Sequence, residues 1–259
     1  MAKWKKIIVA GPLVMETIYP SQNPRDSRTV RAGKKNLSSE AQQRMNQKYS
    51  YQKLELSLAA NYVPGDLVVV LTYDDAHLPA SRKAAEGKIK YFRAKLSAAR
   101  KAKDQELVMH WNIEHKHRHE NKLMDGRFHH HVVINSTGED FELIRKLWGQ
   151  GSVIEIKPLQ VDRDKNYETL ARYMAKEDRD KVGQRSWSYT RNAKKPEVDS
   201  FRIPNDTELL PPDGSTVLMD TGDVCTAYGH YRYLKYLTRG WTATPRPKAK
   251  RRHRPKANK

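Results

Sequence analysis

Strand-like and helix-like segments follow one another in a fixed order between residues 67 and 177. Runs of β-branched residues bounded by turn signals, as in GDLVVVLTYDD, are typical of strands. An apolar stripe at helical spacing in a basic segment, as formed by Ile89, Phe92 and Leu96, predicts an amphipathic helix. These patterns predict strands over 67–73, 107–114, 127–135 and 152–159, and helices over 79–101, 140–148 and 166–177.

This order of elements restricts the fold class. The succession β-α-β-β-α-β is that of the split-βαβ arrangement, also described as ferredoxin-like or RRM-like. It predicts an α+β protein with a central antiparallel sheet and one more helix after the last strand. The helices between the strands would cover one face of the sheet and leave the other face free for a site.

Composition divides the chain into four predicted ranges. We expect a basic N-terminal extension with a helix over 1–62, a main domain over 63–200, a C-terminal appendage over 201–244 and a disordered basic tail over 245–259. Residues 1–36 are polar and basic, and Ser39 with Gln42 forms a capping-box pattern ahead of the helix. In the appendage we expect loop with a short strand over 202–222, and either a strand or a helix over 224–239.

The charge balance favours a polyanionic partner. The formal net charge is +19, and nucleic acid is the commonest partner of such a chain. A solubilising role, a ribosomal-type protein or a membrane-surface protein would share this composition. The single cysteine, Cys225, excludes a disulfide framework or a cysteine-based zinc finger within one chain. Without a long apolar run or a clear signal-peptide pattern, we expect a soluble intracellular protein that has no membrane partner.

Three consecutive histidines stand on the strand expected over 127–135. Side chains two residues apart on a strand share a face, so His129 and His131 should project together and His130 to the opposite side. Paired histidines on a strand are often only surface groups, and two imidazoles can also bind one divalent metal. The pair therefore needs support from a neighbouring strand.

Glu114 offers that support. It ends the strand expected to pair with the histidine strand, on the polar face that also carries His110 and Asn112. Two imidazoles and one carboxylate suit Mn²⁺ or Mg²⁺ acting on phosphate oxygens, and zinc or iron would also fit. The remaining histidines are expected to be structural: His130 in the core, and His115, His117 and His119 in a solvated hairpin loop.

The helix expected over 166–177 carries a candidate nucleophile. Tyr167, Leu170 and Met174 form its apolar stripe, and Tyr173 and Lys176 lie together to one side of the stripe. A tyrosine phenol can attack phosphorus directly, and a lysine one turn away can stabilise the developing charge. The same spacing also fits a structural role, in which the tyrosine packs on the sheet and the lysine is solvated.

These three features, in this order, resemble the HUH endonucleases, specifically the rolling-circle replication initiators of phages and plasmids. The family's first motif, an apolar strand that ends in Thr, is similar to VLTY at 70–73; its histidine–hydrophobic–histidine motif is similar to HHH at 129–131; and its Tyr-x-x-Lys motif is similar to YMAK at 173–176. Glu114 matches by position the glutamate that several members use as a third metal ligand. The likeness covers about residues 66–196 and is strongest to the filamentous-phage gene II type and its relatives in bacterial mobile elements.

The sequence departs from this family pattern at two places. His130 stands at the middle position of the histidine motif, which is normally apolar. Several relatives use two tyrosines, whereas here Tyr167 lies six residues before Tyr173 and on the apolar stripe. We therefore expect a single-tyrosine enzyme, and how the second strand transfer is made stays open.

The resemblance implies a DNA-nicking and strand-transfer enzyme. Tyr173 would attack the scissile phosphate, stay linked to the 5′ end and release a 3′-OH for a host polymerase, with Lys176 assisting. Glu114, His129 and His131 would hold a divalent metal, Mn²⁺ or Mg²⁺. The substrate would be single-stranded or hairpin origin DNA of a phage, plasmid or mobile element in the bacterial cytoplasm, and because the chain has no P-loop motif a host helicase would unwind it. The residues expected to contact DNA are Thr72, Tyr73, Arg185, Trp187, Tyr189, Arg191, Asn192, Lys194 and Lys195.

Two alternatives stay open. A relaxase or transposase would use the same chemistry on a different DNA substrate. A non-enzymatic RRM-like protein would bind single-stranded nucleic acid through a basic, aromatic sheet face. The second alternative predicts aromatic residues where the third strand has His129 and His131.

Overall fold

The computed structural model describes residues 2–21, 40–116, 127–164, 166–176, 185–226 and 229–238. The chain forms two compact units. The central unit comprises Val63–Leu159, and the bipartite unit comprises the described residues of Met1–Tyr62 and Gln160–Ala243. These units and the ranges predicted from the sequence share a boundary near residue 62 and differ after residue 159. The predicted tail, His117 and His119 lie outside the described residues.

The central unit is an α+β module with an antiparallel sheet. Its elements are β3 (Leu67–Leu71), a 3-10 turn η1 (Asp75–His77), α2 (Arg82–Lys101), β4 (Met109–Lys116), β5 (Arg127–Ile134), α3 (Asp140–Trp148) and β6 (Ile154–Pro158). Its four strands follow the order β6-β3-β5-β4, and each neighbouring pair is antiparallel. The elements predicted over 67–159 are thus confirmed in type and order, with ends that differ by a few residues.

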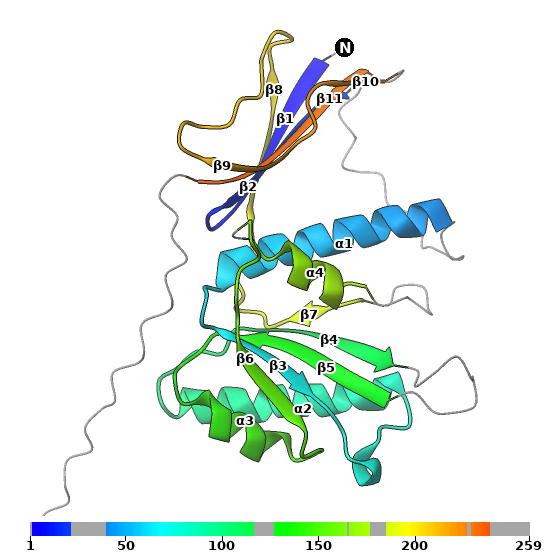
Figure 1. The fold of residues 1–259 in the computed structure, drawn as a ribbon, viewed down its shortest axis with the longest axis vertical. Helices are drawn as coiled ribbons and strands as arrows, with labels where there is room; N and C mark the ends of the chain where they lie inside the picture. Colours follow the sequence, from blue (N-terminus) through cyan, green and yellow to red (C-terminus); the bar gives the residue numbers. More distant parts are fainter. Residues whose placement is uncertain are drawn as a thin grey trace, which may run out of the picture. The chain divides into compact units, whose positions relative to one another are not determined.

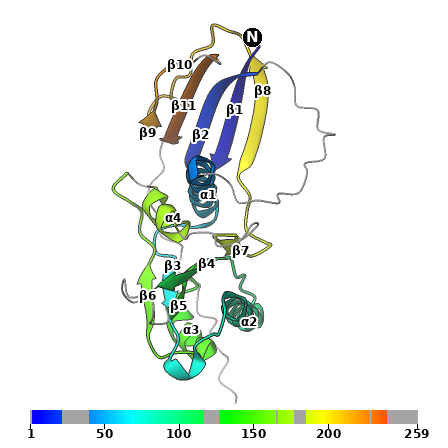
Figure 2. The same cartoon turned by 90° about the vertical axis from the view of Figure 1, so that its right-hand side faces the viewer.

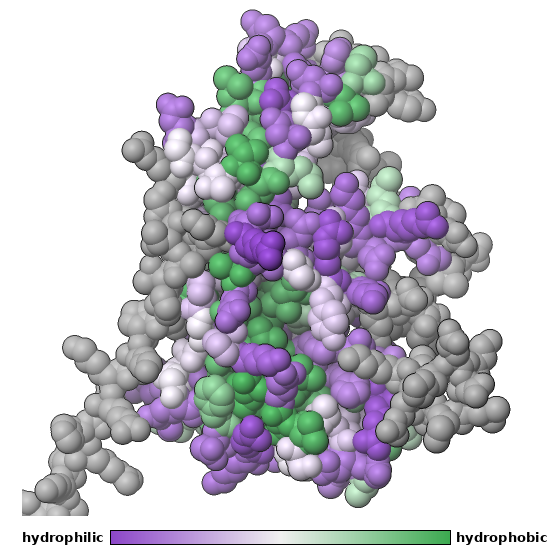
Figure 3. All heavy atoms as spheres, viewed as in Figure 1, coloured by the Kyte–Doolittle hydropathy of each residue, from purple (hydrophilic) through white to green (hydrophobic). Residues whose placement is uncertain are grey.

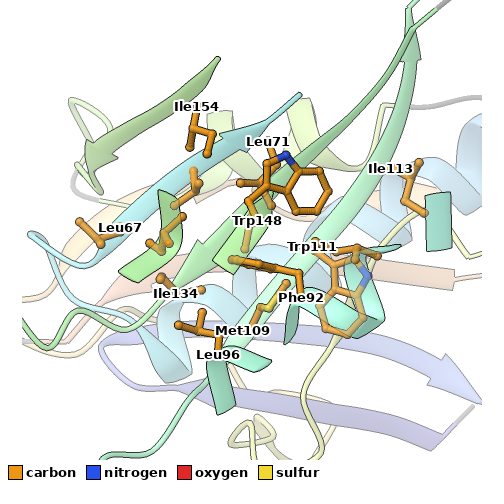
Figure 4. Packing of buried hydrophobic residues seen from close by; sticks show 14 of the residues in the cluster. Leu67, Leu71, Phe92, Leu96, Met109, Trp111, Ile113, Ile134, Trp148 and Ile154 are labelled. Atoms are coloured by element: carbon orange, nitrogen blue, oxygen red, sulfur yellow. The ribbon is translucent and has the colours of Figure 1, made fainter. Parts of the chain in front are cut away.

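Helices α2 and α3 cover one face of this sheet (Figures 1 and 2). The predicted stripe of Ile89, Phe92 and Leu96 is buried in the core between helix and sheet. Trp148, at the end of α3, packs edge-on against Phe92 with ring centroids 5.6 Å apart, and Figure 4 shows both residues within the same apolar cluster. Burial of these large side chains is the main driving force for folding this unit.

A buried polar network joins α2, β5 and α3 at one end of the central unit. The Arg100 guanidinium donates to the Asp140 carboxylate at 2.6 Å, to the Asn135 carbonyl at 2.7 Å and to the Asn135 side-chain oxygen at 2.8 Å. Arg100 and Asp140 are both buried. Because a buried charge is tolerated only when it is paired and hydrogen-bonded, this network fixes the two helices against the end of β5.

The bipartite unit combines both ends of the described chain in one sheet. Strands β1 (Ala2–Ala10) and β2 (Leu13–Ser21) form a hairpin, which pairs on one side with β8 (Glu197–Ile203) and on the other with β11 (Gly229–Leu237). The full strand order is β10-β11-β2-β1-β8, and β9 also pairs with β11. The remaining elements are α1 (Glu40–Asn61), α4 (Glu168–Met174), β7 (Ser188–Tyr189), β9 (Thr216–Asp220) and β10 (Val224–Thr226).

Residues 1–36 were described from the sequence only as a polar and basic extension, and the structure adds the β1–β2 hairpin there. The first half of this segment has three lysines around Trp4 followed by an apolar run over 7–10, the second half begins with an apolar run over 13–15, and Gly11 and Pro12 separate the two halves. Gly11 has a φ of +56°, and the carbonyl oxygen of Ala59 lies 2.6 Å from the place where a Cβ atom would stand. Glycine is therefore required at this turn. The segment over 224–239 likewise contains strands rather than a helix, and the short strand expected within 202–222 is β9.

Helix α1 packs on one face of this sheet. Leu56 joins Leu13, Met15 and Leu237 in a buried cluster. Nearby, the buried Lys235 ammonium of β11 lies 2.5 Å from the Glu55 carboxylate and 2.7 Å from the Glu168 carboxylate. One lysine thus links the sheet to both α1 and α4.

Candidate functional site

Strands β4 and β5 place the predicted metal ligands on one face of the central sheet. Glu114 lies directly opposite His129, and Asn112 lies directly opposite His131. Directly opposed residues of an antiparallel pair project from the same face. The His131 Nε2 atom lies 2.7 Å from a Glu114 carboxylate oxygen, so two of the three predicted ligands are in direct contact. The pairing expected from the sequence is confirmed.

This face is polar and largely buried. His110, Asn112 and His131 are buried, whereas Glu114 and His129 are half-buried. Burial lowers the pKa of His110 to about 3, so its imidazole is neutral near pH 7. The buried side-chain oxygen of Asn112 has no hydrogen-bond partner among the described residues. An unpaired buried acceptor favours the arrival of a donor or a cation on this face.

The donor set fits a divalent cation by type and by shared face. Two imidazoles and a carboxylate are ligands for Mn²⁺, zinc or iron, and the carboxylate also suits Mg²⁺. Within the described part of the chain, however, no three His, Cys, Asp or Glu side chains are gathered as a metal-binding group. The Glu114–His131 hydrogen bond must therefore open before both side chains can bind a cation together with His129.

His130 projects into the core, as predicted. Its Nε2 atom is hydrogen-bonded to the Tyr73 hydroxyl at 2.6 Å, and its ring packs edge-on against Trp148. Burial lowers the pKa of His130 to about 3. The neutral imidazole therefore occupies the position where the related motif has an apolar residue, with its Nε2 atom satisfied by the tyrosine hydroxyl.

Of the two strand-end residues predicted to contact DNA, Tyr73 lies in this core, and Thr72 is half-buried beside it. The Tyr73 side chain is 3% exposed and packs between His130 and Trp148. The Thr72 hydroxyl donates to the Val153 carbonyl at 2.5 Å, and the Thr72 carbonyl accepts from the Trp148 indole at 2.7 Å. Because its side chain is enclosed by these contacts, Tyr73 cannot contact DNA.

His115 also corrects a prediction. It was expected in a solvated loop, but β4 continues through it to Lys116. His115 lies opposite Phe128, and the two rings are stacked with centroids 4.2 Å apart. Because His115 stacks on Phe128 of β5, the pairing of β4 with β5 continues into the segment where the sequence becomes charged.

The predicted nucleophile lies in a cationic cavity of the bipartite unit. Tyr173, on α4, is 42% exposed and lines a cavity of about 440 Å³ between α4 and α1. Among the described residues, the cavity is lined by four cations, two tyrosines and one glutamine, and by no acid: Arg44, Gln47, Lys48, Tyr51, Arg172, Tyr173 and Lys176. Such a wall is suited to a phosphate group.

Lys176 shares the cavity with Tyr173 although the helix ends earlier than predicted. Helix α4 ends at Met174, and the backbone N–H of Lys176 donates to the Tyr173 carbonyl at 3.3 Å. The Gln47 side chain donates to the Lys176 carbonyl at 3.2 Å. On the other side of the helix, Tyr167 and Met174 are buried as expected.

Sequence reasoning missed the cavity wall that α1 supplies. Arg44, Lys48 and Tyr51 have i, i+4, i+7 spacing, which places them on one helical face. The Arg172 guanidinium lies 4.2 Å from the centre of the Tyr51 ring and is also paired with Glu168 at 2.5 Å. Figure 3 shows hydrophilic surface over the N-terminal half of α1. The spacing was visible in the sequence, but only the packing of α4 against α1 shows that this face lines a cavity.

The predicted DNA-binding segment over 185–195 is anchored along α1. The Trp187 indole donates to the Ser50 hydroxyl at 3.2 Å, and Asn61 exchanges two hydrogen bonds with the backbone of Lys194 at 2.7 and 2.9 Å. The rings of Trp187 and Tyr189 lie 5.6 Å apart. The polar side chains predicted to bind DNA are exposed: Arg185, Arg191, Asn192, Lys194 and Lys195.

Comparisons with known proteins identify no relative of the chain. No family model, no curated protein and no solved structure matches the chain. None of the described helices has the length and apolar character needed to cross a membrane.

Proposed function

We propose that the chain is a DNA-nicking and strand-transfer endonuclease of the HUH type that initiates rolling-circle replication of a phage, plasmid or mobile element. The observation that carries the proposal is the cavity around Tyr173. Its described lining combines an exposed phenol with four cationic side chains and no acid, and Arg172 is the one of the four that is paired with Glu168. That combination suits a nucleophile whose target is a phosphodiester.

In the proposed reaction the Tyr173 oxygen attacks the scissile phosphorus as the phenol loses its proton. A new P–O bond to the tyrosine forms, and the bond from phosphorus to the 3′ oxygen breaks. The fragment downstream of the nick stays on the protein through its 5′ phosphate as a phosphotyrosine. The leaving 3′ oxygen takes up a proton, and the resulting 3′-OH of the upstream fragment is free for a host polymerase. Arg44, Lys48 and Lys176 stabilise the negative charge that develops on the phosphate oxygens.

The proposal assigns Glu114, His129 and His131 to a divalent cation, Mn²⁺ or Mg²⁺. When bound, the cation would polarise the scissile phosphate. The chain's own contribution is to hold one carboxylate and two imidazoles on one sheet face, with Glu114 opposite His129 and beside His131. The unpaired Asn112 oxygen on the same face supports a cation there.

The strand order of the central unit supports the same family. Four antiparallel strands in the order β6-β3-β5-β4, with α2 and α3 on one face, have the arrangement of a split-βαβ module. We therefore infer that the central unit is the ferredoxin-like part of an HUH nicking domain. Its site face lies opposite the helices, as the proposed chemistry requires.

The segment over 185–195 would hold the DNA strand. Its exposed arginines and lysines would neutralise phosphates, and the Trp187–Tyr189 ring pair would stack on bases. The proposed substrate is single-stranded or hairpin origin DNA in the cytoplasm of a bacterial host. A host helicase would supply unwinding.

A nicking assay tests the proposal. A 5′- or 3′-labelled single-stranded DNA, preferably a hairpin from the protein's own replicon, is incubated with Mn²⁺ or EDTA and with wild type or Tyr173→Phe. We expect metal-dependent cleavage in which wild type becomes covalently linked to the fragment that lies 3′ of the nick, so that a 3′ label stays on the protein and a 5′ label leaves with the released 3′-OH fragment. The variant should not cleave. DNA binding by both proteins without cleavage in any metal would contradict the proposal.

A non-enzymatic single-stranded nucleic-acid-binding protein is the second candidate. The aromatic pair within a basic segment, half-buried Trp187 and exposed Tyr189, favours it. It predicts that Tyr173→Phe leaves every activity of the protein unchanged. A relaxase or transposase would share the nicking result and differ in the DNA it selects.

A further inference from the structure

The sheet of the bipartite unit has two faces of different composition. Strand register assigns each side chain to a face, because directly opposed residues in antiparallel strands project to the same side. Ile8 lies opposite Met15, and both pack in the cluster that α1 completes through Leu56. We call this side of the sheet the α1 face.

Helix α1 covers only one end of this face. Figure 2 shows α1 crossing the sheet at the end where β1 and β2 join, in agreement with the close approach of the Ala59 carbonyl to Gly11. Trp4 stands four residues before Ile8, about 13 Å further along β1. Alternation places Trp4 on the α1 face, beyond the cluster beneath the helix.

Aromatic and cationic side chains stand side by side at this far end. Trp4 lies opposite Tyr19 on β2 and opposite Arg202 on β8. In the next row Lys6 lies opposite Thr17 and Ser200. Trp4, Lys6 and Tyr19 are half-buried, and Arg202 is exposed. We call Trp4, Lys6, Tyr19 and Arg202 the open aromatic face.

Charge is distributed unequally between the two sides of the sheet. On β1, β2, β8 and β11 the described α1-face positions include Lys6, Arg202 and Lys235 but no Asp or Glu. Glu16, Glu197 and Asp199 all project from the opposite side, where Glu16 pairs with Lys5 at 2.7 Å. Lys235 is already paired under the helix, so Lys6 and Arg202 determine the charge of the open end.

We propose that the open aromatic face binds single-stranded DNA. Bases stack on Trp4 and Tyr19, and Lys6 and Arg202 bind the phosphates between them. Aromatic rings on neighbouring antiparallel strands, combined with cations, form a stacking platform that tolerates any base sequence. The absence of acids from the described positions of this side and the chain's net charge of +19 complement a polyanion. This surface does not depend on the proposed nicking activity, and it gives a role to strands that lie outside the region of the HUH motifs.

The test compares two double variants on the same sheet. Trp4→Leu/Lys6→Gln removes a ring and a charge from the open aromatic face. Lys3→Gln/Phe201→Leu removes a charge and a ring from the opposite side, where Lys3 donates to backbone carbonyls and Phe201 is 39% exposed. Each is made in the full chain carrying Tyr173→Phe, and binding of a labelled oligothymidine of about 20 nucleotides is measured by fluorescence anisotropy in EDTA over a series of salt concentrations.

We expect the first double variant to weaken binding about tenfold or more, the usual effect of losing one stacked base. The plot of log affinity against log salt should become shallower by about 0.7 for the lost phosphate contact. The opposite-side variant should match the parent in both measurements. Trp4→Phe, which keeps a ring, should retain most of the affinity.

Equal affinity of the parent and the Trp4→Leu/Lys6→Gln variant would overturn the proposal. Arg202→Gln/Lys6→Gln leaves the rings in place and protects the test against misfolding, and an unchanged salt dependence in that variant would also overturn it. Trp4-dependent binding of vesicles of phosphatidylserine and phosphatidylcholine, without such dependence for the oligonucleotide, would assign the face to a lipid surface instead. Because EDTA and Tyr173→Phe abolish cleavage, a failed nicking assay leaves this result unaffected.

Discussion

At the scale of single residues, replacing Lys48 tests whether this side chain stabilises the reacting phosphate or contributes only to the net charge of the protein. It lines the cavity of Tyr173, whereas Lys53, five residues later on α1, is exposed and lies outside the cavity. We expect Lys48→Gln to lower the rate of nicking about tenfold, because one cation that stabilises charge in the transition state is lost. Lys53→Gln should leave the rate within about twofold. Single-turnover cleavage of a labelled oligonucleotide measures both, and equal losses in the two variants would show that only the net charge matters.

At the same scale, the sequence identified the side chains that depend on local periodicity. His129, His131 and Glu114 were assigned correctly to one face because a strand alternates with a period of two and one hairpin joins the two strands. The α1 residues around Tyr173 were missed because Arg44 and Tyr173 are 129 residues apart in sequence, and no local pattern reports their proximity. Tyr73 was misassigned because a strand end does not show that Trp148 and His130 will enclose it.

At the scale of elements, the β1–β2 hairpin depends on the glycine at its turn. An alanine at Gly11 would have to hold a φ near +56° and bring its Cβ to 2.6 Å from the Ala59 carbonyl. Gly138 provides the matched control, because its φ is +85° and no atom lies within 4 Å of an added Cβ. We expect Gly138→Ala to cost about 1 kcal/mol of unfolding free energy for the backbone conformation alone. Gly11→Ala should cost clearly more, because α1 must also shift, and urea unfolding of the two variants measures the difference.

Also at this scale, the elements of the central unit, the helices α1 and α4 and the short strand β9 were predicted, whereas the β1–β2 hairpin and β8 were not. Strands β3 to β6 and helices α2 and α3 carry clear apolar periodicities that local sequence shows. The sheet of the bipartite unit pairs Lys5 with Phe201 and Lys235 with Met15, more than 190 residues apart. Strands β9 and β10 are short, and β1, β8 and β11 carry several charged residues, so only the assembled sheet shows which of their sides is buried.

At the scale of the whole molecule, the two units should respond to acid in opposite directions. In the central unit, burial lowers the pKa of His110 and of His130 from 6.5 to about 3. Between those values the unfolded chain binds more protons than the folded one, so the free energy of unfolding falls as the pH falls. In the bipartite unit, burial raises the pKa of Glu55 from 4.5 to about 7. Between those values the folded chain holds the proton, so the free energy of unfolding rises as the pH falls.

Lowering the pH from 7 to 5 should therefore destabilise the central unit while it stabilises the bipartite unit. The largest slope is about 1.4 kcal/mol per pH unit for each buried histidine. Hydrogen exchange of β4 and β5, compared with that of β2 and β11 after correction for the intrinsic rates, measures the two units in one sample. Glu55→Gln should remove the acid stabilisation of β2 and β11 and leave the pH response of β4 and β5 unchanged. A parallel loss of protection in all four strands at pH 5 would contradict separate titration of the units, because protons bound by Glu55 and protons excluded by the histidines act on stability with opposite signs.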